Sequence, residues 1–172
     1  GEYEIAGNIS SQFITGLLFA LPLLNGDSKI KLIPPVESRS YLNITISALK
    51  KFGVEIEEQE NIYIIKGNQQ YKSPNEITVD GDWSNGAFFL CAGALSKEGI
   101  TVSGLDVNSP QGDKKILEIL RRMGADVIIS GTEITVKKNR LFGTIVDAGD
   151  IPNLVPIISV LAKKKKKGVT HI

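Results

Sequence analysis

Hydrophobic and polar positions along the chain follow two periods, and the order in which these periods appear repeats itself. A period of two predicts a strand, whereas apolar residues three or four positions apart predict a helix. Residues 1–67 give the order strand, helix, strand, helix and hairpin. These predicted elements cover residues 3–7, 11–24, 29–33, 39–52, 54–58 and 62–66.

The same order returns in the second half of the chain. Its predicted strands, helices and hairpin cover residues 77–79, 84–96, 100–103, 113–123, 126–130 and 133–137. A third copy has a predicted strand at residues 144–147, a helix at 153–162 and a last strand at 169–172. The pattern therefore stops in the middle of a unit.

The ends of two predicted helices give the clearest sign of the repeat. The sequence LKKFGVEI at residues 49–56 recurs as LRRMGADV at residues 120–127, with Gly53 and Gly124 as expected helix C-caps. We therefore predict an α/β fold of the α+β type, built from repeated strand-helix-strand-helix-hairpin units. A unit of about seventy residues is only marginally stable alone, so we expect the units to pack against partners.

A polar segment at residues 68–75 separates the first copy from the second. It is rich in asparagine and glutamine, and Pro74 disfavours a helix at Ser73. This composition is typical of a linker or a crossover. An ordinary loop between two repeats is the alternative.

Composition excludes several classes of function. Twenty basic and nineteen acidic residues give a net charge of +1, so the surface as a whole is not built for nucleic acid or a membrane. The longest apolar run, residues 14–24, is too short to cross a bilayer. No cluster has metal-ligand spacing and no nucleotide-binding glycine motif occurs, so we expect no metal and no cofactor. The start lacks a secretory leader, which predicts a cytoplasmic protein, and a chain that begins with glycine is expected to be cut or engineered.

We expect structural rather than chemical roles for the single cysteine, the single histidine and the lysine run. Cys91 lies in an apolar run and predicts a buried thiol. His171 lies next to the last residue, so a serine–histidine nucleophilic pair is rejected. The lysine run at residues 163–167 follows the last predicted helix, where cations complement the helix dipole, and predicts a solvated helix end.

The strongest local signal for chemistry is GNISSQF at residues 7–13, where a strand runs into the start of a helix. The free N–H groups and the dipole of a helix start attract anions, and Ser10 and Ser11 add hydroxyl donors without adding bulk. Phosphate is the anion that this arrangement suits. The alternative is that one of these serines only caps the helix.

Three further segments open predicted helices. In ESRSY, Arg39 could pair with a phosphate or a carboxylate, whereas Tyr41 could equally pack into the core. In GDWSNG, Asp82 would repel phosphate and is expected to cap the helix or to accept a hydrogen bond. The segment NSPQGD at residues 108–113 predicts a tight loop that ends in a helix cap.

Together these segments resemble one family, the 5-enolpyruvylshikimate-3-phosphate synthases. GNISSQF, SRSY leading to FGV, GD, NSPQGD and IPN occur in the order and spacing of that family, over essentially the whole chain. Its two similar domains, each assembled from repeated units with helices inside and sheets outside, fit the repeat. The resemblance implies that residues 1–67 are the last unit of one domain and residues 68–75 the crossover. Residues 76–172 would then be the first unit of the second domain and the start of its next unit.

The resemblance also implies an activity and a set of site residues. The reaction is the transfer of the enolpyruvyl group of phosphoenolpyruvate to the 5-hydroxyl of shikimate 3-phosphate, in the shikimate pathway of aromatic amino acid biosynthesis. Ser10 and Ser11 would hold the 3-phosphate, Gln12 would touch the shikimate ring, Ser38 would be a further phosphate donor and Tyr41 would neighbour the substrate. The implied substrate-binding residues are Ser10, Ser11, Gln12, Ser38, Tyr41 and Asn153.

Asn153 departs from the family pattern. The family has an aspartate after Ile-Pro, placed to handle the proton of the substrate hydroxyl, and an amide cannot accept that proton at neutral pH. Ser40, where the family often has proline, is a milder departure. The family's basic residues that clamp phosphoenolpyruvate are missing as well. We therefore expect a portion of an enzyme that is inactive without the remainder of the parent enzyme.

Two other functions stay open. A non-catalytic binding or scaffold domain of the same fold would tolerate Asn153. A related enolpyruvyl transferase that acts on a nucleotide sugar is the other possibility, and the SSQ sequence at residues 10–12 argues against it.

Overall fold

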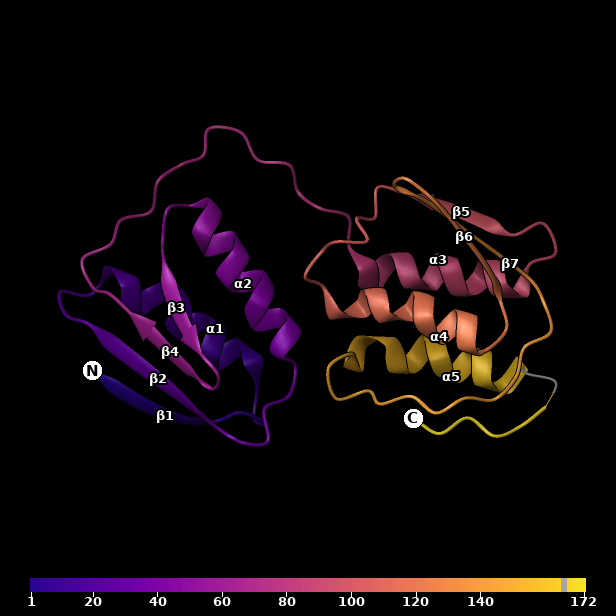
Figure 1. Cartoon of the computed structure of the whole chain (residues 1–172), viewed down its shortest axis with the longest axis horizontal. Coiled ribbons are helices and arrows are strands. Elements are labelled where there is room, and N and C mark those ends of the chain that lie inside the picture. Colours follow the sequence, from indigo (N-terminus) through magenta and orange to yellow (C-terminus); the bar gives the residue numbers. More distant parts are fainter. Residues whose placement is uncertain (165–166) are drawn as a thin grey trace. The chain divides into compact units, whose positions relative to one another are not determined.

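A computed structural model describes residues 1–164 and 167–172 of the chain (Figure 1). The chain divides into two compact units, Gly1–Thr78 and Val79–Ile172. Each unit has its own hydrophobic core, and none of the described residues belongs to both. Over the described ranges, no helix has the length and apolar character that crossing a membrane requires.

A mixed four-stranded sheet forms one side of the first unit. Its strands are β1 (Glu2–Ala6), β2 (Ser28–Ile33), β3 (Ile56–Gln59) and β4 (Ile62–Ile65). They lie in the order β1-β2-β4-β3, with β1 and β2 parallel and the other neighbours antiparallel. Ala6 lies opposite Ile33, so β1 and β2 end together at the same edge of the sheet.

Helices α1 (Ser11–Ala20) and α2 (Arg39–Lys51) pack against each other and cover one face of this sheet. The helix predicted for residues 11–24 ends earlier, because Pro22 has no N–H to continue it and the chain tightens into a 3₁₀ turn, Leu21–Leu23. Apolar side chains on one face of each helix meet the inward side chains of the strands. The fully buried residues of this core include Ile14, Leu18, Leu42, Leu49, Ile30, Leu32, Tyr63 and Ile65.

The second unit packs helices against a three-stranded antiparallel sheet. Its elements are α3 (Trp83–Leu95), β5 (Ile100–Ser103), α4 (Ile116–Arg122), β6 (Asp126–Ser130), β7 (Glu133–Lys137) and α5 (Val155–Lys164). The strand order is β5-β7-β6. Two 3₁₀ turns, Gly112–Lys115 and Pro152–Leu154, lead into α4 and α5.

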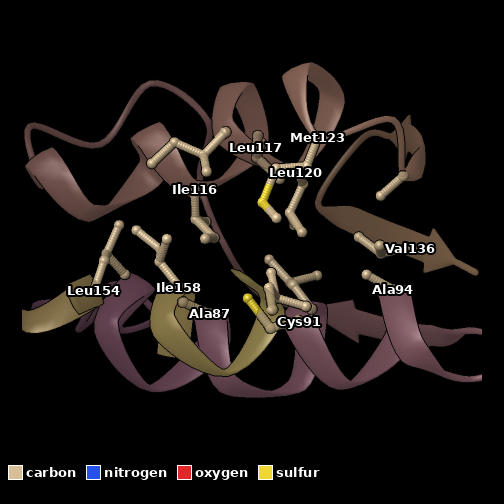
Figure 2. Packing of buried hydrophobic residues seen from close by; sticks show 14 of the residues in the cluster. Ala87, Cys91, Ala94, Ile116, Leu117, Leu120, Met123, Val136, Leu154 and Ile158 are labelled. Carbon is tan, nitrogen blue, oxygen red and sulfur yellow. The ribbon is translucent and has the colours of Figure 1, made fainter. Parts of the chain in front are cut away.

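Helix α3 is the centre of the second unit. Its small residues Ala87, Cys91 and Ala94 let neighbouring elements approach closely, and Figure 2 shows Ala87 beside Ile158 of α5 and Ala94 beside Val136 of β7. Burial raises the pKa of the Cys91 thiol to about 12. Cys91 is therefore the buried thiol that the sequence predicted.

The segment at residues 77–79 is not a strand, contrary to the prediction. It pairs with no strand of the described structure, and Val79 is 87% exposed. Three alternating residues offer too few positions to fix a strand against a sheet. Strand β5 is consequently an edge strand of its sheet.

The third copy of the repeat is also less regular than predicted. Residues 144–147 and 169–172 form no strands, and the described part of this region has two isolated parallel bridges, Phe142 with Lys167 and Ile145 with His171. Glycines near these bridges weaken a regular ladder, because glycine loses more backbone freedom than any other residue.

Helix ends follow the sequence signals closely. Gly53 and Gly124 have φ angles of 78° and 91°, in the left-handed region that a C-cap requires, so both predicted caps are confirmed. The described part of α5 runs to Lys164, and its last two residues, Lys163 and Lys164, are exposed. Residues 165–166 of the predicted lysine run lie outside the described residues.

Candidate functional site

The parallel pair of strands brings two helix starts to one edge of the first unit. Because β1 and β2 end together, the loops after them leave from neighbouring points and lead into α1 and α2. Both helices thus direct their free N–H groups and positive dipole ends toward the same edge. The sequence placed Ser10, Ser11 and Gln12 at one start and Ser38 and Tyr41 at the other, and the structure brings these two sets together.

Gly7 is where the two loops touch. The backbone N–H of Glu37 donates to the carbonyl of Gly7 at 3.1 Å. A Cβ atom at Gly7 would lie 2.7 Å from Val36 Cγ2 and 2.9 Å from Val36 Cα. Only glycine permits this approach, so the first residue of the GNISSQF motif holds the second loop against the first.

Ser10 caps helix α1. Its backbone is extended, with a φ angle of −167°, and its Oγ accepts a hydrogen bond from the backbone N–H of Gln12 at 3.3 Å. The capping interpretation of the sequence is therefore confirmed for Ser10. Ser11 is half-buried, Gln12 is exposed and Phe13 is 67% exposed, so the first turn of α1 is open to solvent.

Ser38 occupies the corresponding place before α2 in an unusual conformation. Its φ angle of 56° lies in the left-handed region, which few non-glycine residues adopt, and its side chain does not cap the helix. The backbone N–H of Tyr41 donates to the carbonyl of Ser38 at 3.1 Å. Tyr41 itself is half-buried one turn into the helix. Strained residues of this kind are concentrated at functional sites.

Arg39 anchors the β3–β4 hairpin, and of the two partners that the sequence allowed, a phosphate or a carboxylate, it has the carboxylate of Glu58. Its guanidinium donates to the carbonyl of Glu60 at 2.9 Å, to Asn61 Oδ1, and lies 3.3 Å from Glu58 Oε1. These contacts join the first residue of α2 to the turn of the hairpin. Arg39 is thus engaged within the protein, and the hydroxyls and backbone N–H groups of the helix starts are the donors that we consider for an anion at this edge.

One hollow of the first unit lies away from these helix starts. It has a volume of about 310 Å³ and is lined by residues that include Ile46, Lys50, Val54 and Ile64. Ile46 and Lys50 belong to the second half of α2, whereas Ser38 and Tyr41 lie at its beginning. We therefore place the candidate site at the helix starts, where hydrogen-bond donors converge, and not in this hollow.

A second polar cluster surrounds the start of α3 in the other unit. Asp82 caps the helix, as predicted, by accepting from the backbone N–H of Ser84 at 2.9 Å and from Asn85 Nδ2 at 2.6 Å. The side chain of Gln111 accepts from the backbone N–H of Trp83 at 2.6 Å. The indole N–H of Trp83 donates to the carbonyl of Asp106 at 2.9 Å.

Asn153 belongs to this second cluster. Its Nδ2 donates to Ser84 Oγ at 3.4 Å, and Ser84 Oγ donates to Asp113 Oδ2 at 2.5 Å. The segments GDWSNG, NSPQGD and IPN, which are far apart in the chain, therefore meet at one helix start. Asn153 lies in the second unit and the five other predicted site residues lie in the first.

Sequence reasoning missed Ser84 and Asp113. It treated residues 108–113 as a loop that ends in a helix cap, but Gln111 holds the N-cap position and Asp113 lies inside the 3₁₀ turn, 2% exposed. A buried aspartate is rarely left without partners, but the sequence does not show that Asp113 is buried. The described residues contain no group of three or more His, Cys, Asp or Glu side chains able to hold a metal ion.

Two solved structures share this fold. The EPSP synthase of Acinetobacter baumannii matches with a TM-score of 0.74 and 20% identity, over 99% of this chain and 40% of that one. The enolpyruvyl transferase NikO from Streptomyces tendae matches with a TM-score of 0.73 and 17% identity, over 98% of this chain and 44% of that one. The predicted class is confirmed: the chain has the α/β fold of the enolpyruvyl transferases.

Sequence comparison places the chain within this class. The family model for EPSP synthase (3-phosphoshikimate 1-carboxyvinyltransferase) matches residues 1–172. Proteins described as 3-phosphoshikimate 1-carboxyvinyltransferase from Clostridium novyi (strain NT) and Clostridioides difficile (strain 630) are each 48% identical over 162 residues, which is 94% of this chain and 37% of theirs. The chain belongs to the EPSP synthase family, and it spans about two fifths of the length of the curated relatives it matches.

Proposed function

We propose that the chain is a substrate-binding portion of a 3-phosphoshikimate 1-carboxyvinyltransferase. The whole enzyme would move the enolpyruvyl group of phosphoenolpyruvate onto the 5-hydroxyl of shikimate 3-phosphate. In this proposal the first unit carries the residues that bind the 3-phosphate, and Asn153 of the second unit stands where the family has its aspartate. The assignment of residues 1–67 and 76–172 to different domains, joined at residues 68–75, belongs to the same proposal.

One observation carries the proposal: two helix starts with serine side chains lie at one sheet edge. Ser10 and Ser11 precede or open α1, and Ser38 precedes α2. Free backbone N–H groups, hydroxyl donors and two helix dipoles favour a phosphate without any metal. Gln12 is exposed beside them and can donate to a hydroxyl of a sugar-acid ring.

Asn153 favours a second candidate function, a binding domain without catalysis. An amide at this position can hydrogen-bond a substrate hydroxyl but cannot remove its proton at neutral pH. Both functions predict phosphate binding at the first unit. They differ in the turnover of the full-length protein, so release of inorganic phosphate by that protein from both substrates together separates them; we expect negligible release by this chain alone under either function.

Binding is tested by titrating shikimate 3-phosphate into the isotope-labelled chain and following backbone amide NMR signals. We expect the signals of Ser10, Ser11, Gln12 and Ser38 to shift together. The variant S11A should bind about tenfold more weakly or worse, because it removes a hydroxyl donor to a charged group and leaves the Ser10 cap in place.

The control for this titration is S159A, a serine-to-alanine change on α5 of the other unit, where Ser159 Oγ donates to the carbonyl of Val155. It should bind as the unchanged chain does. Inorganic phosphate and shikimate, titrated separately, show which half of the ligand is recognised. Unchanged spectra at millimolar shikimate 3-phosphate, or equal loss in both variants, would refute the site.

A further inference from the structure

Three side chains from separate segments form a line of hydrogen bonds at the start of α3. Asn153 Nδ2 donates to Ser84 Oγ at 3.4 Å, and Ser84 Oγ donates to Asp113 Oδ2 at 2.5 Å. Asp113 is 2% exposed, Ser84 is half-buried and Asn153 is exposed. The line therefore runs from the surface of the second unit to a buried carboxylate.

The direction of these bonds is fixed by the hydroxyl. A serine has one proton to donate, and the short bond to Asp113 uses it. The Ser84 hydroxyl can therefore only accept a hydrogen bond from residue 153. The amide nitrogen of Asn153 is the donor, so the amide oxygen points away from Ser84. This contact therefore favours one of the two orientations of the Asn153 amide.

We propose that Ser84 and Asp113 are positioning residues for the side chain at position 153. The functional part of this inference rests on the proposed function, in which position 153 faces the substrate hydroxyl. Neither residue has to touch the substrate for this role. Asp113 acts through the Ser84 hydroxyl, and the Ser84 hydroxyl acts on residue 153.

The same arrangement determines what an acid at position 153 would experience. In N153D, two carboxyl groups would share one hydroxyl proton, and two like charges at such a distance cannot both be ionised without cost. The charged groups of the segments that meet here include Asp82, which caps the same helix, and Asp150, whose carboxylate lies 3.7 Å from Lys115. The pKa of the new carboxyl should therefore lie above that of an ordinary aspartate. A raised pKa makes a carboxylate a better general base for an alcohol.

The first test follows the side-chain amide signals of Asn153 in the isotope-labelled, ligand-free chain. Removal of the hydroxyl in S84A should move these signals and narrow the separation between the two amide protons. The control S159A should leave them in place. Unmoved Asn153 signals in a folded S84A variant would overturn the positioning role.

The second test measures the titration of the new carboxyl of N153D by carbon NMR. We expect a pKa about one pH unit above that of an ordinary aspartate, which is about 3.9, and a return toward that value when D113N is added. A purely structural role of Asp113 would change stability without moving this pKa. A titration at the ordinary value, or one that D113N does not alter, would overturn the coupling.

Both tests are made without substrate, and this separates them from the proposed function. If shikimate 3-phosphate fails to bind at the first unit while S84A still moves the Asn153 signals, the network stands and the ligand is wrong. If binding occurs and the Asn153 signals do not respond, the ligand stands and the positioning role is wrong.

Discussion

Tyr63 shows how a single buried group links the hairpin to the start of α2. Its ring is fully buried in the first core, and its hydroxyl donates to Glu58 Oε1 at 3.5 Å. Burial, and then the charge of Glu58, raise the pKa of Tyr63 to about 12, although the guanidinium of Arg39 acts in the opposite direction. The carboxylate that holds Arg39 thus also adds to the effect of burial on the pKa of Tyr63.

This shift predicts how stability changes with alkaline pH. The pKa of Tyr63 is raised on folding, so its contribution is complete below about pH 10 and is lost as the pH rises toward 12. Between these values the chain should lose about 2 kcal/mol relative to the variant Y63F. Urea unfolding of both proteins across this range measures the difference. If the free energies of unfolding of the two proteins changed equally with pH, the raised pKa of Tyr63 would be contradicted.

At the scale of elements, the site depends on how closely two loops approach. The loop after β1 and the loop after β2 meet at Gly7, where a methyl group would collide with Val36. Gly16, in the middle of α1, is the opposite case, because a Cβ atom there meets no other atom within 4 Å. Gly7 is therefore required by close packing between the two loops, whereas no contact requires Gly16.

Alanine substitutions at the two positions test this difference. G7A should destabilise the chain by about 1–3 kcal/mol and weaken phosphate binding, because the second loop must move away. G16A should stabilise it by about 0.5–1 kcal/mol and leave binding unchanged, because alanine favours the helix. Urea unfolding and the phosphate titration measure both effects. Equal destabilisation by the two changes would show that Gly7 is not a contact point.

The elements were predictable from the sequence where local rules decide them. The capping serine at position 10 and the C-cap glycines are local signals, and they appear where the pattern placed them. The partners of Arg39 lie 19 to 22 residues away, and Asp113 lies 29 residues from Ser84. Periodicity carries no information about such pairs, so the roles of Arg39 and Asp113 became visible only in three dimensions.

At the scale of the whole molecule, the chain has two cores and two kinds of natural probe. The only tryptophan, Trp83, is fully buried in the second unit. All the tyrosines lie in the first unit, at positions 3, 41, 63 and 71. Tryptophan fluorescence therefore reports on one core, and tyrosine signals report on the other.

We expect the variant L90A to separate the two signals. Leu90 is fully buried in the core of α3, and truncation of such a residue costs about 2–5 kcal/mol. The tryptophan transition should move to lower urea, whereas the tyrosine transition should stay within about 0.5 kcal/mol of its original position, since distant sites act independently. Movement of both transitions together would show that the two units unfold as one.

The vacant side of β5 has a practical consequence. In the first unit the corresponding strand, β2, has β1 beside it, whereas in the described part of the second unit β5 has a neighbour, β7, on one side only. Its outward N–H and C=O groups pair with no strand of the described structure, and such an edge is where another extended chain can add a strand. The association of this chain with itself should therefore depend on protein concentration, because more frequent encounters favour pairing between strands of different molecules.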